Sequence, residues 1–122
     1  MKQIILITLF AGFLAGCVSP TNLSGPSGTA MAQIMAASKL AKTCDVVDLV
    51  PSPIDVAAAQ SGVSSEQLKA YTFYGNSDQL EAAGDQSLAI RGLDIADEAS
   101  LCNFASSVVG TEDAIGKFLT AG

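Results

Sequence analysis

The chain carries three cysteines, and their thiols are its most reactive side chains. Cys17 follows an uncharged run near the N-terminus, whereas Cys44 and Cys102 lie far apart in the rest of the chain. A cysteine sulfur can be alkylated by a lipid or can pair with a second thiol as a disulfide. The sequence has no histidine, which excludes Ser-His-Asp triads, Cys-His pairs and imidazole metal sites. The available chemistry is therefore modification and cross-linking of cysteine.

The residues before Cys17 have the parts of an export signal. Residues 1–3 include Lys2, and residues 4–14 carry no charge. This run is shorter than the roughly 20 apolar residues that span a bilayer, so it is read as a signal peptide of residues 1–16. The alternative to a lipid-modified signal is an ordinary secretory signal that happens to contain a cysteine.

The sequence Leu-Ala-Gly-Cys at residues 14–17 resembles the lipobox of bacterial lipoproteins. That resemblance implies cleavage between Gly16 and Cys17, a diacylglycerol on the Cys17 sulfur and acylation of the new amine. Several acyl chains hold a protein on a bilayer without spanning it. Val18 stands where an aspartate would resemble an inner-membrane retention signal. We therefore expect a lipid-anchored protein in the cell envelope, on the inner leaflet of the outer membrane and facing the periplasm.

The chain after the anchor divides into a tether and one domain. Residues 17–29 contain two prolines, two glycines and several hydroxyl residues, a composition typical of a flexible lipidated tether. Residues 30–122 remain for a single small globular domain. A domain of this size buries little apolar surface, so we expect a covalent cross-link to stabilise it. In an oxidising compartment Cys44 and Cys102 form an even pair, so we expect a disulfide between them; two buried free thiols are the alternative.

The first elements of the domain are expected to be helical. Residues 30–44 are rich in Ala, Met, Leu and Lys, which favour helix, and Thr29 is a suitable cap. Residues 45–50 either extend this helix or form a short strand, and Pro51 ends either one.

Two short helices joined by a tight turn are expected next. Ser52 and Pro53 form a helix start, and Gly62 is a natural stop. The capping box at residues 64–67 opens the second helix. A strand is the competing reading for residues 68–74, because aromatic residues and threonine suit a sheet.

The last third of the chain carries further helix signals. A short capped helix is expected from Ser77 to a stop at Gly84, and the longest C-terminal helix from residues 94–109, with Cys102 on its apolar stripe. Residues 111–119 add a last turn or two. The expected fold class is mainly α: a small disulfide-stapled helical bundle, with a small α+β envelope domain as the alternative.

Residues 56–68, VAAAQSGVSSEQL, have the A-x-x-x-G-V-S-x-x-x-L spacing that resembles DNA-binding helix-turn-helix units. The spacing meets the packing demands of any tight helical corner, where Ala58 and Gly62 allow close approach. Loss of Lys2 with the signal leaves a net charge of −7, which repels phosphates. We expect no nucleic-acid partner.

The same corner also resembles the helical half of a LysM peptidoglycan-binding module, in which a short strand follows the second helix. Residues 51–53 depart from that family, since they read Pro-Ser-Pro where Gly-Asp-Thr is expected. The segment SLAIRG, residues 87–92, followed by residues 99–119, loosely resembles the strand-helix-strand end of a BON envelope domain. The LysM resemblance implies peptidoglycan as a possible partner.

No catalytic or cofactor motif accompanies these features. Walker, G-x-S-x-G, S-x-x-K and EF-hand patterns have no match, and we expect no enzyme activity, no cofactor and no metal site. The aromatic cluster Tyr71, Phe73 and Tyr74 offers contact to a partner or burial in the core, and Arg91 offers either a partner contact or a pair with an acid. The expected function is a non-catalytic structural or protein-interaction component of the envelope; the alternative is peptidoglycan binding by a degenerate LysM-type module.

Overall fold

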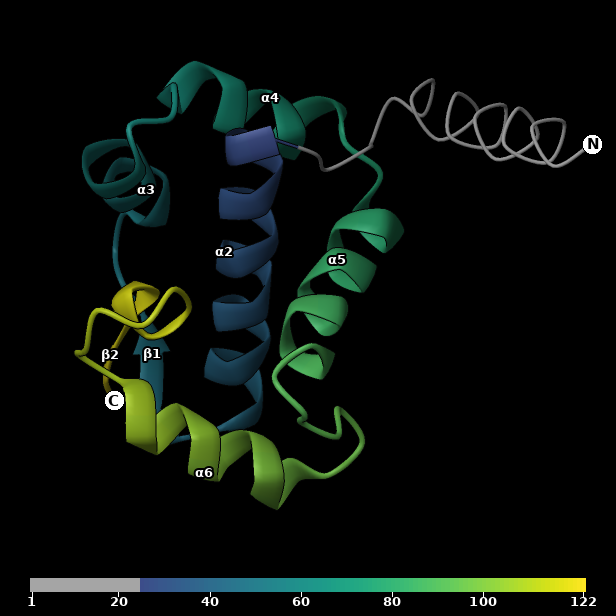
Figure 1. Cartoon of the computed structure of the whole chain (residues 1–122), viewed down its shortest axis with the longest axis vertical. Helices are drawn as coiled ribbons and strands as arrows, with labels where there is room; N and C mark the ends of the chain where they lie inside the picture. Colours follow the sequence, from purple (N-terminus) through teal and green to yellow (C-terminus); the bar gives the residue numbers. More distant parts are fainter. Residues whose placement is uncertain (1–24) are drawn as a thin grey trace, which may run out of the picture.

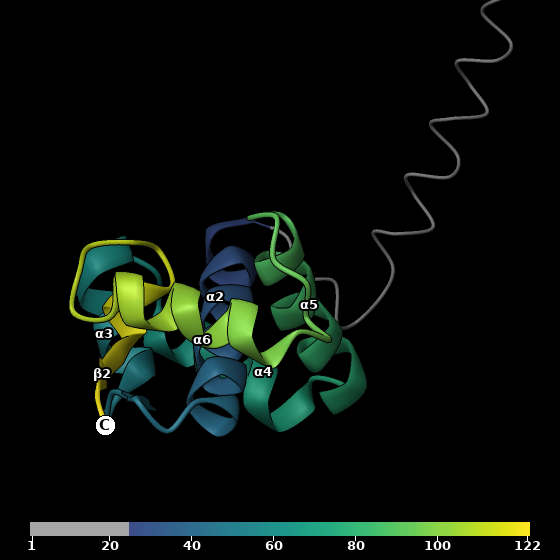
Figure 2. The same ribbon diagram turned by 90° about the horizontal axis from the view of Figure 1, so that it is seen from below.

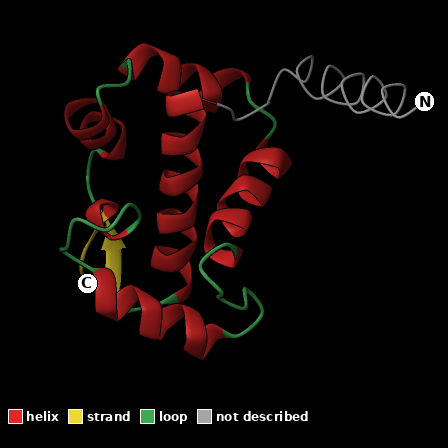
Figure 3. Ribbon diagram, viewed as in Figure 1, coloured by secondary structure: helices red, strands yellow, loops and turns green. Residues whose placement is uncertain are grey.

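A computed structural model describes residues 25–122, and within that range the protein is mainly helical, as the sequence predicts (Figure 1). Figure 3 distinguishes the helices from a two-stranded sheet at the edge of the fold. The elements are α2 (Gly25–Thr43), β1 (Val47–Leu49), α3 (Pro53–Ser61), α4 (Ser65–Tyr74), α5 (Ser77–Ala89), α6 (Glu98–Val108), the 3-10 helix η1 (Gly116–Phe118) and β2 (Leu119–Ala121).

Helix α2 is the axis of the domain. It contacts α3, α4, α5, α6, β1 and η1, which surround it in Figure 1. A helix that neighbours cover on several sides must be apolar around most of its circumference, and small side chains let those neighbours approach. Its buried residues meet both conditions: Gly28, Ala30, Met31, Ile34, Ala36, Ala37 and Leu40.

Helix α2 begins earlier than the sequence predicts, and this corrects the boundary of the tether. Residues 25–29, assigned to the flexible tether, are helical, and Gly28 is buried. Thr29 lies inside the helix and does not cap it. Pro26 is compatible with this start because the amide hydrogens of a first helical turn need no partner within the helix. Residues 17–24 lie outside the described range.

Local signals correctly place the α3–α4 corner. Gly62 ends α3 with φ 70°, a left-handed conformation that suits glycine, and its amide donates to the Ala58 carbonyl at 3.2 Å. Ser64 Oγ accepts from the Gln67 amide at 3.4 Å and caps α4. Val63 is buried in the turn. The competing strand at residues 68–74 is wrong, because this segment is helical.

Helix α5 does not stop at Gly84, contrary to the prediction. It continues to Ala89, and a Cβ at Gly84 would lie 2.9 Å from the Met35 carbonyl carbon of α2. The glycine therefore permits close packing of two helices and ends neither of them. Residues 87–89 belong to α5, so the strand that the BON resemblance requires at residues 87–92 is absent from the described structure.

Helix α6 begins later than predicted, at Glu98, and Val109 lies just beyond its end. The Asp94 side chain accepts from the Ala96 amide at 2.9 Å, and Asp97 caps α6 by accepting from the Ser100 amide at 3.2 Å. Both interactions compete with helical hydrogen bonding, so residues 94–97 stay outside the helix.

The chain closes with a sheet that the sequence only partly indicates. Residues 45–50 contain the short strand β1, one of the two predicted outcomes, which pairs antiparallel with β2 in the register Val47 to Ala121. The predicted final turn is the 3-10 helix η1, but Leu119 already belongs to β2.

The predicted disulfide between Cys44 and Cys102 is present, with Cα atoms 5.4 Å apart. Cys44 immediately follows α2 and is 2% exposed, and Cys102 lies in α6. Figure 2 shows α6 lying across the end of α2. The bond thus fastens α6 to the central helix.

Candidate functional site

Two of the predicted site residues, Gly16 and Cys17, lie outside the described residues, so cleavage and lipidation stay predictions. A search of residues 25–122 finds no helix with the length and hydropathy needed to cross a bilayer. The predicted partner contacts can be located with one exception: the side chains of Phe73 and Tyr74, at the end of α4, lie outside the described part of the structure.

Tyr71 is partly buried and packs against the hydrophobic core. Its ring therefore contributes to packing, the outcome that sequence composition favours for an aromatic residue on a small domain.

Arg91 pairs with an acid inside the domain, which is one of the two outcomes expected for it. Its Nη1 donates to both carboxylate oxygens of Asp113, at 2.9 and 2.6 Å, and its guanidinium carbon lies 5.3 Å from the centroid of the Phe104 ring. An arginine held by a carboxylate and an aromatic face is fixed in place. Arg91 thus ties the loop after α5 to the turn before η1.

Asp113 connects Arg91 to the turn before η1. It also accepts from the amides of Ile115 at 2.8 Å and Gly116 at 3.1 Å. Partial burial raises the pKa of the Asp113 carboxyl, but the Arg91 hydrogen bond, the two amide hydrogen bonds and the positive charge of Arg91 together outweigh burial. The resulting pKa lies below its ordinary value of 3.8. Asp113 therefore serves the fold as an ionised carboxylate.

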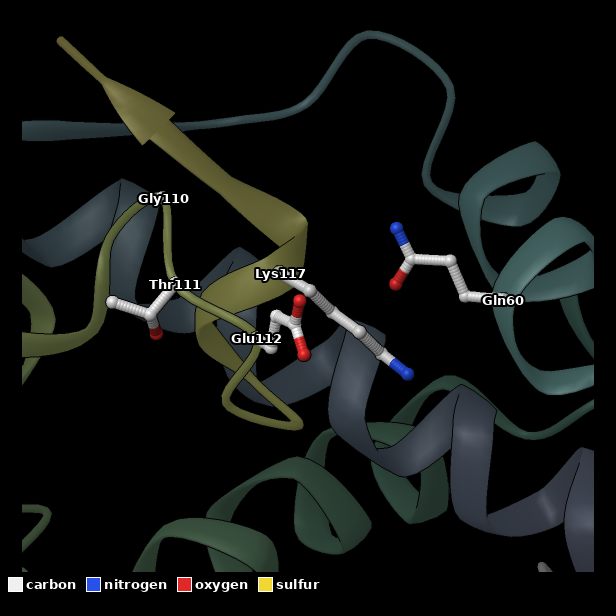
Figure 4. Close-up of a pocket in the computed structure, with 5 residues that line it drawn as sticks. All are labelled: Gln60, Gly110, Thr111, Glu112 and Lys117. Carbon is white, nitrogen blue, oxygen red and sulfur yellow. The ribbon is translucent and has the colours of Figure 1, made fainter.

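A pocket of about 700 Å³ lies between the end of α3 and the segment that follows α6 (Figure 4). Gly110, with φ 75°, turns the chain after α6. Lys117 Nζ donates to Ser61 Oγ at 3.2 Å and lies 5.3 Å from the centroid of the Phe118 ring. The lining residues are Gln60, Gly110, Thr111, Glu112 and Lys117.

This lining supplies one ammonium, one carboxylate, one amide and one hydroxyl. Such groups can hydrogen-bond a small polar ligand, and the pocket has the volume of a small-molecule site. Its hydroxyl and its ammonium group are both engaged within the fold, since Thr111 Oγ1 donates to the Val108 carbonyl at 2.6 Å and Lys117 Nζ donates to Ser61 Oγ. In the part of the chain that the structure describes, no group of three or more His, Cys, Asp or Glu side chains could hold a metal ion.

A second pocket, of about 350 Å³, lies between α2 and α5. Lys39 Nζ lies 3.1 Å from Asp85 Oδ1, an ion pair that joins the two helices across it. That oxygen accepts no hydrogen bond of good geometry, so the contact with Lys39 is electrostatic. Because its charges offset one another, this pocket favours neither an anion nor a cation.

The α6 end of the molecule carries the exposed large hydrophobic residues of the described range. Val46 is 53% exposed, Ile90 76% and Ile95 39%. Sequence reasoning missed Ile90, although the helical period contains the signal: Leu80, Gly84 and Leu88 are buried at four-residue spacing, and Ile90 lies off that line. Ile95 falls within the helix predicted for residues 94–109 and instead lies in the loop before α6.

Comparison of the chain with protein-family models, curated proteins and solved structures finds no match. The LysM resemblance also loses an element, because α5 follows α4 where that family has a strand. The α3–α4 corner is therefore explained by its packing, through buried Ala57, Val63 and Leu68.

Proposed function

We propose that the protein is a lipid-anchored lipoprotein of the bacterial cell envelope, acylated at Cys17, which acts as a non-catalytic interaction or structural component facing the periplasm. The observation that carries the proposal is the combination of the Leu-Ala-Gly-Cys sequence at residues 14–17 with a disulfide in the domain that follows. Each feature alone is weaker support than the two together.

The disulfide supports export for a redox reason. Disulfides persist in oxidising compartments such as the periplasm and are rare in the reducing cytosol. Once Cys17 is assigned to the lipid, Cys44 and Cys102 are the cysteines that remain, and they form the disulfide. Each of the three cysteines then has a role that fits an exported lipoprotein.

A non-catalytic role is supported by three cations that the fold itself engages. Arg91 and Asp113 hold each other, Lys39 lies against Asp85, and Lys117 donates to Ser61. Charged side chains that are engaged in the fold are poor candidates for general acid-base catalysis, which needs a group poised to exchange a proton with a substrate.

Peptidoglycan binding remains the second candidate, and one observation favours it. The pocket of Figure 4 borders the α3–α4 corner through Gln60 and is lined by polar side chains, which suit the hydroxyl and amide groups of a glycan. The test is co-sedimentation of a soluble form beginning at Val18 with purified peptidoglycan. Our proposal predicts that the protein stays in the supernatant, and clear co-pelleting that Gln60→Ala and Lys117→Ala abolish would favour the second candidate.

The anchor is tested by fractionating cells of a Gram-negative bacterium that express the full chain or its Cys17→Ala variant. The full chain should be in the membrane fraction and should incorporate a clickable fatty acid, and the variant should lose the label. Ser19→Ala is the matched control and should behave as the unaltered chain. Equal labelling of the Cys17→Ala variant would contradict the proposal.

A further inference from the structure

The domain has two opposite ends, and the anchor joins only one of them. Helix α2 starts at Gly25 beside α4, where Ser27 Oγ donates to Gln67 Oε1 at 2.8 Å. Helix α6 lies across the other end of α2 (Figures 1 and 2). At a rise of 1.5 Å per residue the 19 residues of α2 separate these ends by about 28 Å.

The short tether orients the domain relative to the bilayer. This orientation rests on the proposed lipidation of Cys17. Residues 18–24 join Cys17 to Gly25, and a segment of that length spans at most about 28 Å in any conformation. The α4 end is therefore the one tied to the bilayer. The α6 end is the one presented to the periplasm.

The presented end carries apolar side chains on a well-fixed segment, residues 90–98, which we call the distal loop; it comprises the connection from α5 to α6 and the first residue of α6. Ile90 and Ile95, its exposed large apolar residues, are 76% and 39% exposed. The loop is held by the Arg91 pair with Asp113 and by backbone bonds such as Gly92 to Ala89, at 2.9 Å. A surface fixed in this way loses little conformational freedom when a partner binds.

The exposed charged side chains of the distal loop are mostly acidic. Asp94, Asp97 and Glu98 are exposed on the distal loop, whereas its one cation, Arg91, is neutralised by Asp113. Carboxylates on the same loop as exposed apolar side chains complement a basic surface that also has apolar side chains. They repel a second copy of the same loop and the anionic headgroups of a bilayer.

We infer that the distal loop is a docking surface for a basic face that also has apolar side chains, on a periplasmic or membrane-bound envelope protein. Ile90 and Ile95 supply the apolar contacts, and the carboxylates of the same loop supply charge complementarity and orientation. Such a surface provides the partner contact that the proposed function requires.

The test is photocrosslinking in living cells with the full acylated chain. p-Benzoylphenylalanine is placed at position 90, at position 95, or at exposed Lys69 of α4 as the control. We expect one discrete adduct from positions 90 and 95 and none from position 69, with a basic segment of one envelope protein in the cross-linked peptide. Adducts of equal yield from position 69, adducts with a second copy, lipid or peptidoglycan, or no adduct at all would overturn the inference.

A binding measurement between the purified domain and the purified cross-linked protein distinguishes direct docking from mere proximity in the cell. Ile90→Ser and Glu98→Gln should each weaken binding about five- to tenfold, and rising salt should weaken it further. Lys69→Ser is the matched control. Both loop residues are exposed, so an unchanged melting temperature verifies the fold. Unchanged affinity in both loop variants would refute the inference.

The same cells distinguish the two proposals. If Cys17 carries no lipid but position 90 still gives the adduct, the anchor is wrong and the docking surface stands. If Cys17 is acylated and positions 90 and 95 give no adduct, the anchor stands and the docking surface is wrong.

Discussion

Removing the disulfide should cost a large fraction of the stability of the domain. The bond closes a loop of 58 residues, for which the loss of unfolded-state entropy corresponds to about 4 kcal/mol. A domain of this size has a total stability of about 5–15 kcal/mol. The double variant Cys44→Ala, Cys102→Ala avoids burying a hydroxyl group at Cys44, which is 2% exposed. Its free energy of unfolding should be lower by about 3–4 kcal/mol.

Urea denaturation followed by circular dichroism at 222 nm measures this difference on the soluble form beginning at Val18. The oxidised protein should unfold at higher urea than the double variant, and a reductant should shift only the oxidised protein. The slope of the free energy against urea should rise in the variant, because an unfolded chain without the cross-link exposes more surface. A loss below about 1 kcal/mol would refute the reasoning, since packing alone would then hold α6 on α2.

Three smaller changes test individual contacts. Gly84→Ala should lower the free energy of unfolding by about 1–3 kcal/mol in thermal melts despite its better helix propensity, because the new methyl meets the Met35 backbone at 2.9 Å; an increase would contradict the close approach. Asn76→Ala should lower the free energy of unfolding by about 1 kcal/mol, because the cap of α5 is lost, and Asn76→Ser should lower it much less. Equal urea midpoints for these two variants would contradict the cap. The pKa of Asp113 in the folded protein lies below its usual 3.8, so the stability that this carboxylate contributes is complete above about pH 5 and is lost as the pH falls through the lowered pKa. Between pH 6 and pH 3 the urea midpoint should therefore fall more steeply for the unaltered protein than for Asp113→Asn. Parallel curves for the two proteins would contradict this.

The parts of the fold that sequence predicts well are those decided by neighbours in the chain. The α3–α4 corner is specified within a dozen residues by Pro53, Gly62 and the Ser64 cap. The disulfide follows from counting the cysteines that remain once Cys17 is set aside for the predicted anchor.

The errors concern residues whose conformation distant contacts decide. Gly84 has the local character of a helix stop, but it lies inside α5 because the α2 backbone is its neighbour in space. Strands β1 and β2 have three residues each, and Val47 pairs with Ala121 from the other end of the domain. No window of sequence contains such pairs, so the strand at residues 45–50 could be expected only as one of two outcomes, and its pairing with residues 119–121 could not be expected at all.

The candidate functional residues also divide into those that the sequence could predict and those that depend on tertiary contacts. The pairing of Arg91 with an acid was one of two expected outcomes, and its partner Asp113, 22 residues away, could not be chosen from the sequence. The pocket beside Lys117 joins Gln60 to the segment after α6, so it too depends on tertiary structure. The exposure of Ile90 was accessible from helical spacing, since Leu88 marks the buried side of α5.

The most direct test of the central claim is mass spectrometry of the N-terminal peptide of the full chain, purified from bacterial membranes. The account predicts that this peptide begins at Cys17 and carries a diacylglyceryl group on the sulfur together with an acyl chain on the amine. A peptide that begins elsewhere, or one with an unmodified Cys17, would contradict the lipid anchor and remove the orientation that it gives to the domain.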